Sequence, residues 1–174
     1  MSTSKNLSYK IKPFILTAVI ILLDQITKIW VMKNIPLNTI YGEYLGDFLW
    51  IVHVRNTGAA FSLGAGSSVF ARVLFFVVLP LVVMGFVAYA IFTERKFLTR
   101  VQKYFAAGIL GGGLGTLVDR IFRFREGVVD FISVKFYGIF GMDRWPTFNI
   151  SDSCVVIFVI LFAISVIFGK EETK

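Results

Sequence analysis

The sequence predicts a membrane all-α fold: four transmembrane helices, with a small extracytoplasmic β-sheet cradle and a loop on the outer face. Hydrophobic residues make up 56% of the 174 residues and the mean hydropathy is +0.76, which is too apolar for a soluble domain of this length. Four apolar segments are long enough to cross a bilayer, which takes about 20 helical residues. Two further segments are rich in aromatic and β-branched residues. We expect residues 1–174 to form a single integral membrane domain.

Each expected span has its own character. The first follows a basic N-terminus, as a signal peptide would, but it carries Asp24 and lacks a small-x-small cleavage site, so we interpret it as retained. The second contains Arg72 near its start and Pro80 midway. The third is rich in glycine and ends at Asp119 and Arg120, and the fourth is almost free of polar groups. The expected boundaries are residues 11–31, 69–92, 104–122 and 152–168.

Basic residues beside the apolar segments predict the orientation. The relevant ones are Lys5, Lys10 and Lys12 before the first span, and Arg95, Lys96, Arg100 and Lys103 between the second and third. By the positive-inside rule, both termini and the 93–103 connection lie in the cytoplasm. The outer segments, 34–67 and 123–148, then face the opposite side. The net charge of +7 is scattered beside the spans, so it indicates membrane orientation and no nucleic-acid partner.

The two outer segments are predicted to contain strands. The stretches FLWIVHVR (48–55) and VVDFISVKFYGIF (128–140) are dominated by apolar, aromatic and β-branched residues. We expect a small sheet resting on the outer membrane surface, where aromatic rings are favoured. The rings expected to face that interface are Trp50, Phe131, Phe136 and Tyr137.

Two carboxylates stand out in the stretch from Gly127 to Cys154. Asp130 lies within VVDFI, and Asp152 lies two residues before the last apolar run. Acids in apolar surroundings are costly, so they do chemistry, move ions or pair with a base. If the two lie together, one keeps a proton while the other draws a proton from a water that attacks a carbonyl. Asn149, one turn before Asp152, is expected near the N-cap of that helix.

Other polar residues leave alternatives open. Asp24 and Lys28 are four apart, so they form an ion pair with Lys28 extending outward to the headgroups, or Asp24 faces the bundle interior. Asp119 and Arg120 are interpreted as structural, and Thr116 shares a face with Asp119. Asn56 lies in a run of small residues, 55–64, which by itself predicts only a turn.

The remaining reactive side chains point to no cofactor. Cys154 is a single cysteine, which excludes an intrachain disulfide, and no Cys/His cluster indicates zinc. His53, the one histidine, falls in an expected outer strand and is interpreted as structural. In the third span, two small-xxx-small pairs, Gly108/Gly112 and Gly111/Gly115, predict close helix packing. We expect no metal and no cofactor.

Five ordered motifs resemble those of the bacterial lipoprotein signal peptidases, the type II signal peptidases. They are DQITK (24–28), VRNTGAAFS (54–62), GGLGTLVDR (112–120), VVDFI (128–132) and FNISD (148–152). Their order, spacing and four-span topology agree with that family over nearly the whole chain.

The resemblance implies a membrane-embedded aspartic protease of the bacterial cytoplasmic membrane, with its active site toward the outer face. Such an enzyme removes the signal peptide from diacylglyceryl-modified prolipoproteins, cutting before the lipidated cysteine. By their motifs, Asp130 and Asp152 match the catalytic dyad. The supporting or substrate-binding positions would be Asp24, Asn56, Asp119, Arg120, Asn149 and, with least weight, Thr116. The expected partners are lipidated prolipoproteins and membrane lipid, and the chain is expected to act as a monomer.

Two departures and two rival interpretations accompany the resemblance. Thr116 stands where the family usually has Asn, Ser151 where Ala is common, and the stretch from Arg120 to Asp130 is slightly long. A proton-coupled transporter would use the acids as a relay, but it predicts internal repeats and carboxylates spread through the membrane depth. A non-enzymatic assembly subunit would explain the glycines and leave the pair Asp130/Asp152 unexplained.

Overall fold

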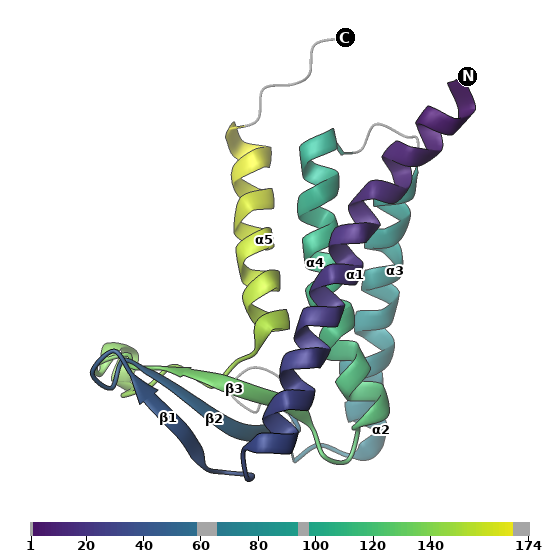
Figure 1. Cartoon of the computed structure of the whole chain (residues 1–174). Coiled ribbons are helices and arrows are strands. Elements are labelled where there is room, and N and C mark those ends of the chain that lie inside the picture. Colours follow the sequence, from purple (N-terminus) through teal and green to yellow (C-terminus); the bar gives the residue numbers. More distant parts are fainter. Residues whose placement is uncertain (1, 59–65, 94–97, 169–174) are drawn as a thin grey trace.

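The computed structural model describes residues 2–58, 66–93 and 98–168. Within them, four helical segments are long and apolar enough to cross a membrane, which confirms the predicted fold class. The helices are α1 (Ser2–Asn34), the continuous run α2 (Val69–Val73), η2 (Leu74–Val78) and α3 (Leu79–Phe92), then α4 (Arg100–Phe122) and α5 (Ile150–Phe168). The start of α1 and the end of α5 lie at one end of the bundle, and a small sheet lies at the other (Figure 1).

A π-helical turn interrupts the second span. The amide of Leu79 donates to the carbonyl of Leu74, five residues back, so η2 is one residue wider than an α-helical turn. Pro80 follows at once; it lacks an N–H, and its ring would clash with a carbonyl of the preceding α-helical turn. The π turn therefore accommodates the proline without ending the span.

Glycines allow α4 to occupy the middle of the bundle, packed against α1, α3 and α5. A Cβ on Gly108 would overlap the ring of Phe158 in α5, and one on Gly112 would lie 2.5 Å from the carbonyl oxygen of Ser151. A Cβ on Gly111 would instead meet α1, 2.9 Å from the Cβ of Ile20. The predicted close packing of the third span is thus confirmed: its glycines admit a different neighbour on each face.

The sheet has three antiparallel strands in the order β1 (Ile40–Tyr44), β2 (Leu49–Asn56) and β3 (Val128–Val134). The strands expected in 48–55 and 128–140 are β2 and β3, and β1 is an addition. Opposite Asp130 in β3 lies Val54 of β2, next to a register shift. Beyond β3 the chain doubles back, and the carbonyl of Phe148 accepts from the amides of Phe131 (3.0 Å) and Ile132 (2.9 Å). This return places the start of α5 beside the middle of β3.

Phe131, one of the four rings expected to face the membrane interface, is buried inside the protein. Phe131 is only 7% exposed and packs in a core cluster with Val31, Ile35 and Val129. Side chains alternate along a strand, so Val129 and Phe131 face the end of α1 while Asp130 faces the other way. The prediction for Phe131 was therefore wrong, because strand alternation directs this ring into the core.

Candidate active site

Asp130 reaches its position because β3 alternates. Val128 and Asp130 line a cavity, whereas Val129 between them is fully buried in the cluster with α1. Asp130 is only 3% exposed, and its Oδ1 accepts a 2.7 Å hydrogen bond from Nδ2 of Asn149. A carboxylate so enclosed requires partners, and Asn149 supplies one of them.

Asp152 lies in the first turn of α5 and forms a reciprocal cap with Asn149. The amide of Asp152 donates to Oδ1 of Asn149 (3.0 Å), and the amide of Asn149 donates to Oδ2 of Asp152 (3.1 Å). This arrangement satisfies the free amides at a helix N-terminus. The N-cap position expected for Asn149 is confirmed. Since its side chain also donates to Asp130, one buried residue binds both carboxylates.

Burial and charge change the acidity of Asp130. Its pKa is raised to about 7, first by burial and then by the negative charge of Asp152. Hydrogen bonds from Asn149 and Asn56, and the positive charge of Lys28, oppose this rise only in part. Around neutral pH the pair can therefore hold one proton on Asp130, as expected for two carboxyl groups that share a site.

A buried ion-pair network lies behind the dyad. Nζ of Lys28 is 2.8 Å from Oδ2 of Asp24 and 2.6 Å from Oδ2 of Asp119, and the three side chains are fully buried. The alternative in which Asp24 faces the bundle interior is confirmed, and the alternative in which Lys28 extends to the headgroups was wrong: the two residues pair inside the bundle. Asp119 on α4 places a second carboxylate inside the bundle, so the ammonium is neutralised there.

The same network holds the start of α5. Oδ1 of Asp24 accepts a 3.0 Å hydrogen bond from the amide of Ser151, the residue before Asp152. On the other side, Asp119 pairs with Arg123, whose guanidinium also donates to Oε1 of Gln25 at 3.0 Å. These contacts therefore connect helices α1, α4 and α5 next to Asp152.

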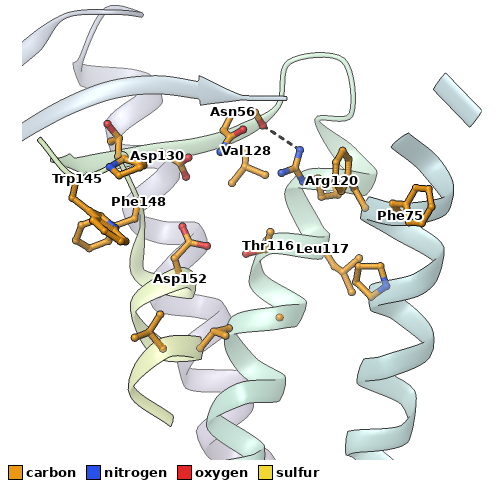
Figure 2. A pocket seen from close by; sticks show the side chains of 17 residues that line it. Asn56, Phe75, Thr116, Leu117, Arg120, Val128, Asp130, Trp145, Phe148 and Asp152 are labelled. Carbon is orange, nitrogen blue, oxygen red and sulfur yellow. Dashed lines mark hydrogen bonds between the residues drawn. The ribbon is translucent and has the colours of Figure 1, made fainter. Parts of the chain in front are cut away.

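Arg120 ties the end of β2 to α4. Its guanidinium donates to the carbonyl oxygens of Asn56 (3.1 Å) and Gly58, and it stacks over the ring of Phe76 at 5.1 Å. Figure 2 shows Arg120 and Asn56 joined above the cavity, at the side away from Asp152. Both predicted residues therefore belong to the site, with Arg120 holding backbone in place.

The two acids face each other across one end of a cavity of about 590 Å³ (Figure 2). Asn56, Thr116 and Arg120 line it as well, so five of the eight predicted site residues meet there. Asp24, Asp119 and Asn149 lie behind its wall. The rest of the lining is mainly apolar and comes from η2, α3, α4, β3, α5 and the segment before α5: Phe75, Phe76, Pro80, Gly113, Leu117, Val128, Trp145, Pro146, Thr147, Phe148, Val155 and Val156.

Three contributors were absent from the predicted site: Lys28, Arg123 and Ser151. Lys28 and Arg123 each follow an acid by four residues, a spacing that could have indicated them once those acids were taken as buried. Ser151 contributes a backbone amide, which no side-chain pattern reveals. Among the described residues, no group of three His, Cys, Asp or Glu side chains could hold a metal ion.

Comparison with known proteins identifies the family. The family model described as "Signal peptidase (SPase) II" matches residues 16–168. The chain belongs to this signal peptidase II family. It is a membrane aspartic endopeptidase and a multi-pass bacterial membrane protein.

Similar signal peptidases cover most of the chain. The lipoprotein signal peptidase of Treponema denticola is 51% identical over 83% of this chain and 82% of its own length. That of Borrelia hermsii is 44% identical over 89% of each chain. A solved structure titled as a bacterial membrane enzyme superposes with a TM-score of 0.75 at 26% identity, covering 94% of this chain and 93% of the other. The relatives thus support the family assignment, and the solved structure supports the fold.

Proposed function

We propose that this signal peptidase II removes the signal peptide from diacylglyceryl-modified prolipoproteins, cutting before the lipidated cysteine, with Asp130 and Asp152 activating a water. The observation that carries the mechanism is that both carboxylates face one cavity and are hydrogen-bonded to the same buried residue, Asn149. A pair held in this way can divide the roles of acid and base.

The raised pKa of Asp130 assigns those roles. In the proposed mechanism Asp130, with its pKa raised to about 7, holds the shared proton at the start, and Asp152 acts as the base. Asp152 takes a proton from the water as its oxygen attacks the scissile carbonyl, and Asp130 gives its proton to the carbonyl oxygen. When the tetrahedral intermediate collapses, Asp152 passes its proton to the leaving nitrogen and Asp130 recovers one from the hydroxyl. The products are the carboxyl end of the signal peptide and the free amine of the lipidated cysteine.

The cavity supports a lipidated peptide as the partner. Apolar side chains of η2 and α5, such as Phe75, Phe76, Val155 and Val156, line it beside the acids, and both helices expose apolar side chains outside it. A substrate that carries acyl chains can therefore remain among apolar groups while its peptide bond lies at the carboxylates. Both acids come from one chain, which supports a monomer as the active unit.

Processing of a lipidated prolipoprotein by the purified protein in vesicles tests this proposal. We expect Asp130→Asn and Asp152→Asn each to reduce cleavage by at least about 10²–10⁴-fold, the contribution of one positioned acid or base. The matched control is Asp143→Asn, which removes an exposed carboxylate from the same outer segment and should leave cleavage unchanged. Substantial cleavage by either dyad variant would contradict the two-aspartate mechanism, and equal cleavage of an unlipidated precursor would contradict the substrate assignment.

A further inference from the structure

The free end of the sheet, away from the bundle, exposes apolar side chains from two neighbouring turns. One turn joins β1 to β2 and contains Leu45, which is 77% exposed. The other follows β3 and contains Tyr137, Ile139 and Phe140, which are 67%, 51% and 85% exposed. We call these four residues the sheet tip. Phe136 lies beside the ring of Phe140 and Lys135 beside that of Tyr137, yet all four side chains remain at least half exposed.

Three residues of the sheet tip have a strained backbone conformation. Leu45, Tyr137 and Phe140 have φ values of 55°, 53° and 54°, in the left-handed region that favours glycine. A bulky side chain is unfavourable there, and such strain persists only where the surroundings enforce it. Glycine at these positions would relieve the strain but would lack an apolar side chain. The exposed apolar side chains therefore require an explanation.

Ion pairs connect the two turns. Asp47 of the first turn pairs with Lys135, and its Oδ1 also accepts from Nη1 of Arg144 at 3.2 Å. Arg144 stacks 3.7 Å from the centre of the Trp50 ring and donates to Oγ of Ser133 at 2.9 Å. The Lys135 ammonium beside Asp47 lowers the pKa of that carboxyl, so the pair stays charged and the two charges compensate each other.

The position of the sheet tip along the membrane normal, relative to the start of α5, indicates what covers it. In Figure 1, the free end of the sheet lies beyond α5 at the height where α5 begins, whereas α1 and α4 extend further. Residue 150 is where the last membrane span starts, so the sheet tip stands at the edge of the bilayer that surrounds α5. Aromatic and aliphatic side chains next to an ion-paired group with an excess of positive charge suit the boundary between headgroups and acyl chains.

We propose that the sheet tip inserts into the lipid leaflet beside α5 and anchors the free end of the sheet. The occupant of this apolar surface is bilayer lipid. Because β3 carries Asp130 and continues into the strained turn, the anchor sets the depth of the strand that bears this acid. This inference goes beyond the proteolytic function and does not depend on it.

Site-directed fluorescence in vesicles tests the anchor without any substrate. An environment-sensitive label is attached at position 140 through Phe140→Cys, in a Cys154→Ala background, and the protein is reconstituted into phosphatidylcholine and phosphatidylglycerol. We expect blue-shifted emission, quenching by a lipid with a nitroxide near the start of its acyl chain, and weak quenching by aqueous iodide. A label placed through Ile139→Cys provides a second reading if the first variant folds poorly.

Two controls test whether a blue shift at position 140 comes from insertion of the sheet tip into lipid. A label placed through Arg125→Cys, in the exposed turn between α4 and β3, should emit at longer wavelength and be quenched by iodide. Replacing Leu45, Tyr137 and Ile139 with serine should shift the emission of the label at position 140 to longer wavelength. Water-like emission at both tip positions would overturn the proposal, and so would emission at position 140 that does not respond to the serine replacements.

Discussion

Asn149 shows at the scale of one residue why this site requires an amide. Its carbonyl oxygen accepts from the amide of Asp152, its NH₂ donates to Asp130, and its own backbone amide donates to Asp152. A carboxylate at this position could not donate to Asp130, and a leucine could make neither side-chain bond. The side chain is fully buried, so no water replaces these bonds. The geometry of the pair thus depends on one uncharged polar side chain.

The acidity of Asp130 leads to a prediction about pH. The pKa of this carboxyl is raised to about 7, so it is protonated below that pH and loses its proton as the pH rises through it. If the reaction requires one proton on the pair, kcat should fall about tenfold per pH unit above roughly pH 7. The measurement is kcat for a lipidated substrate in vesicles at saturating concentration across neutral pH. A rate that rises steadily above pH 8 would contradict the assignment of the proton to Asp130.

At the scale of elements, α4 brings the site together because each of its faces carries a different kind of residue. Glycines face α1 and α5, Asp119 points to the buried lysine, and Thr116 and Arg120 face the cavity. The absence of a side chain at position 112 allows the first turn of α5, with Asp152, to lie against α4. The position of one dyad member therefore depends on a residue without a side chain.

Gly112→Ala should move α5 and lower activity. The new Cβ would lie 2.5 Å from the carbonyl oxygen of Ser151, a backbone atom that cannot move alone. We expect a loss of about 1–3 kcal/mol in the free energy of unfolding from overpacking, with a larger relative loss of processing. Gly85→Ala is the matched control: it lies in a helix with open space around it, so alanine should leave stability unchanged or raise it by up to about 1 kcal/mol. Equal behaviour of the two variants would contradict this account of helix packing.

Asp119 connects two elements, and its replacement should act on stability first. Asp119→Asn leaves Lys28 and Arg123 with one carboxylate fewer in a buried network. Removing one partner of a buried ion pair costs about 3–5 kcal/mol, so the thermal unfolding temperature in detergent should fall clearly. Asp143→Asn, at an exposed carboxylate, should leave that temperature unchanged. A variant at 119 that is as stable as the wild type yet inactive would place Asp119 among the groups that act on substrate.

At the scale of the whole molecule, the polar groups gather at one end of the bundle. Asp24, Asp119, Asp130 and Asp152 are linked through Lys28, Ser151 and Asn149 next to the sheet. A transporter relay would need acids distributed through the membrane depth. This clustering, together with the family assignment, removes the transporter interpretation.

The orientation of the molecule in the membrane can be tested by labelling. The start of α1, the end of α3 and the start of α4 lie at the end opposite the sheet (Figure 1). We expect a membrane-impermeant thiol reagent to label Arg125→Cys in intact cells, in a Cys154→Ala background. Phe97→Cys, in the 93–103 connection but outside the described residues, should be labelled only after permeabilisation. The reverse pattern would place the sheet in the cytoplasm.

The sequence alone determined the class of the molecule, its four spans and two of its three strands, and it supplied the residues that the proposed mechanism uses. Hydropathy and motif spacing are properties of short segments, so they need no knowledge of packing. The tertiary structure decided which groups meet. Lys28 turns inward because α4 places the buried carboxylate of Asp119 next to it, and Phe131 is buried because the end of α1 packs against β3. It also showed that Asn149 binds both acids. These outcomes depend on contacts between distant segments, and periodicity along one segment carries no information about its neighbours.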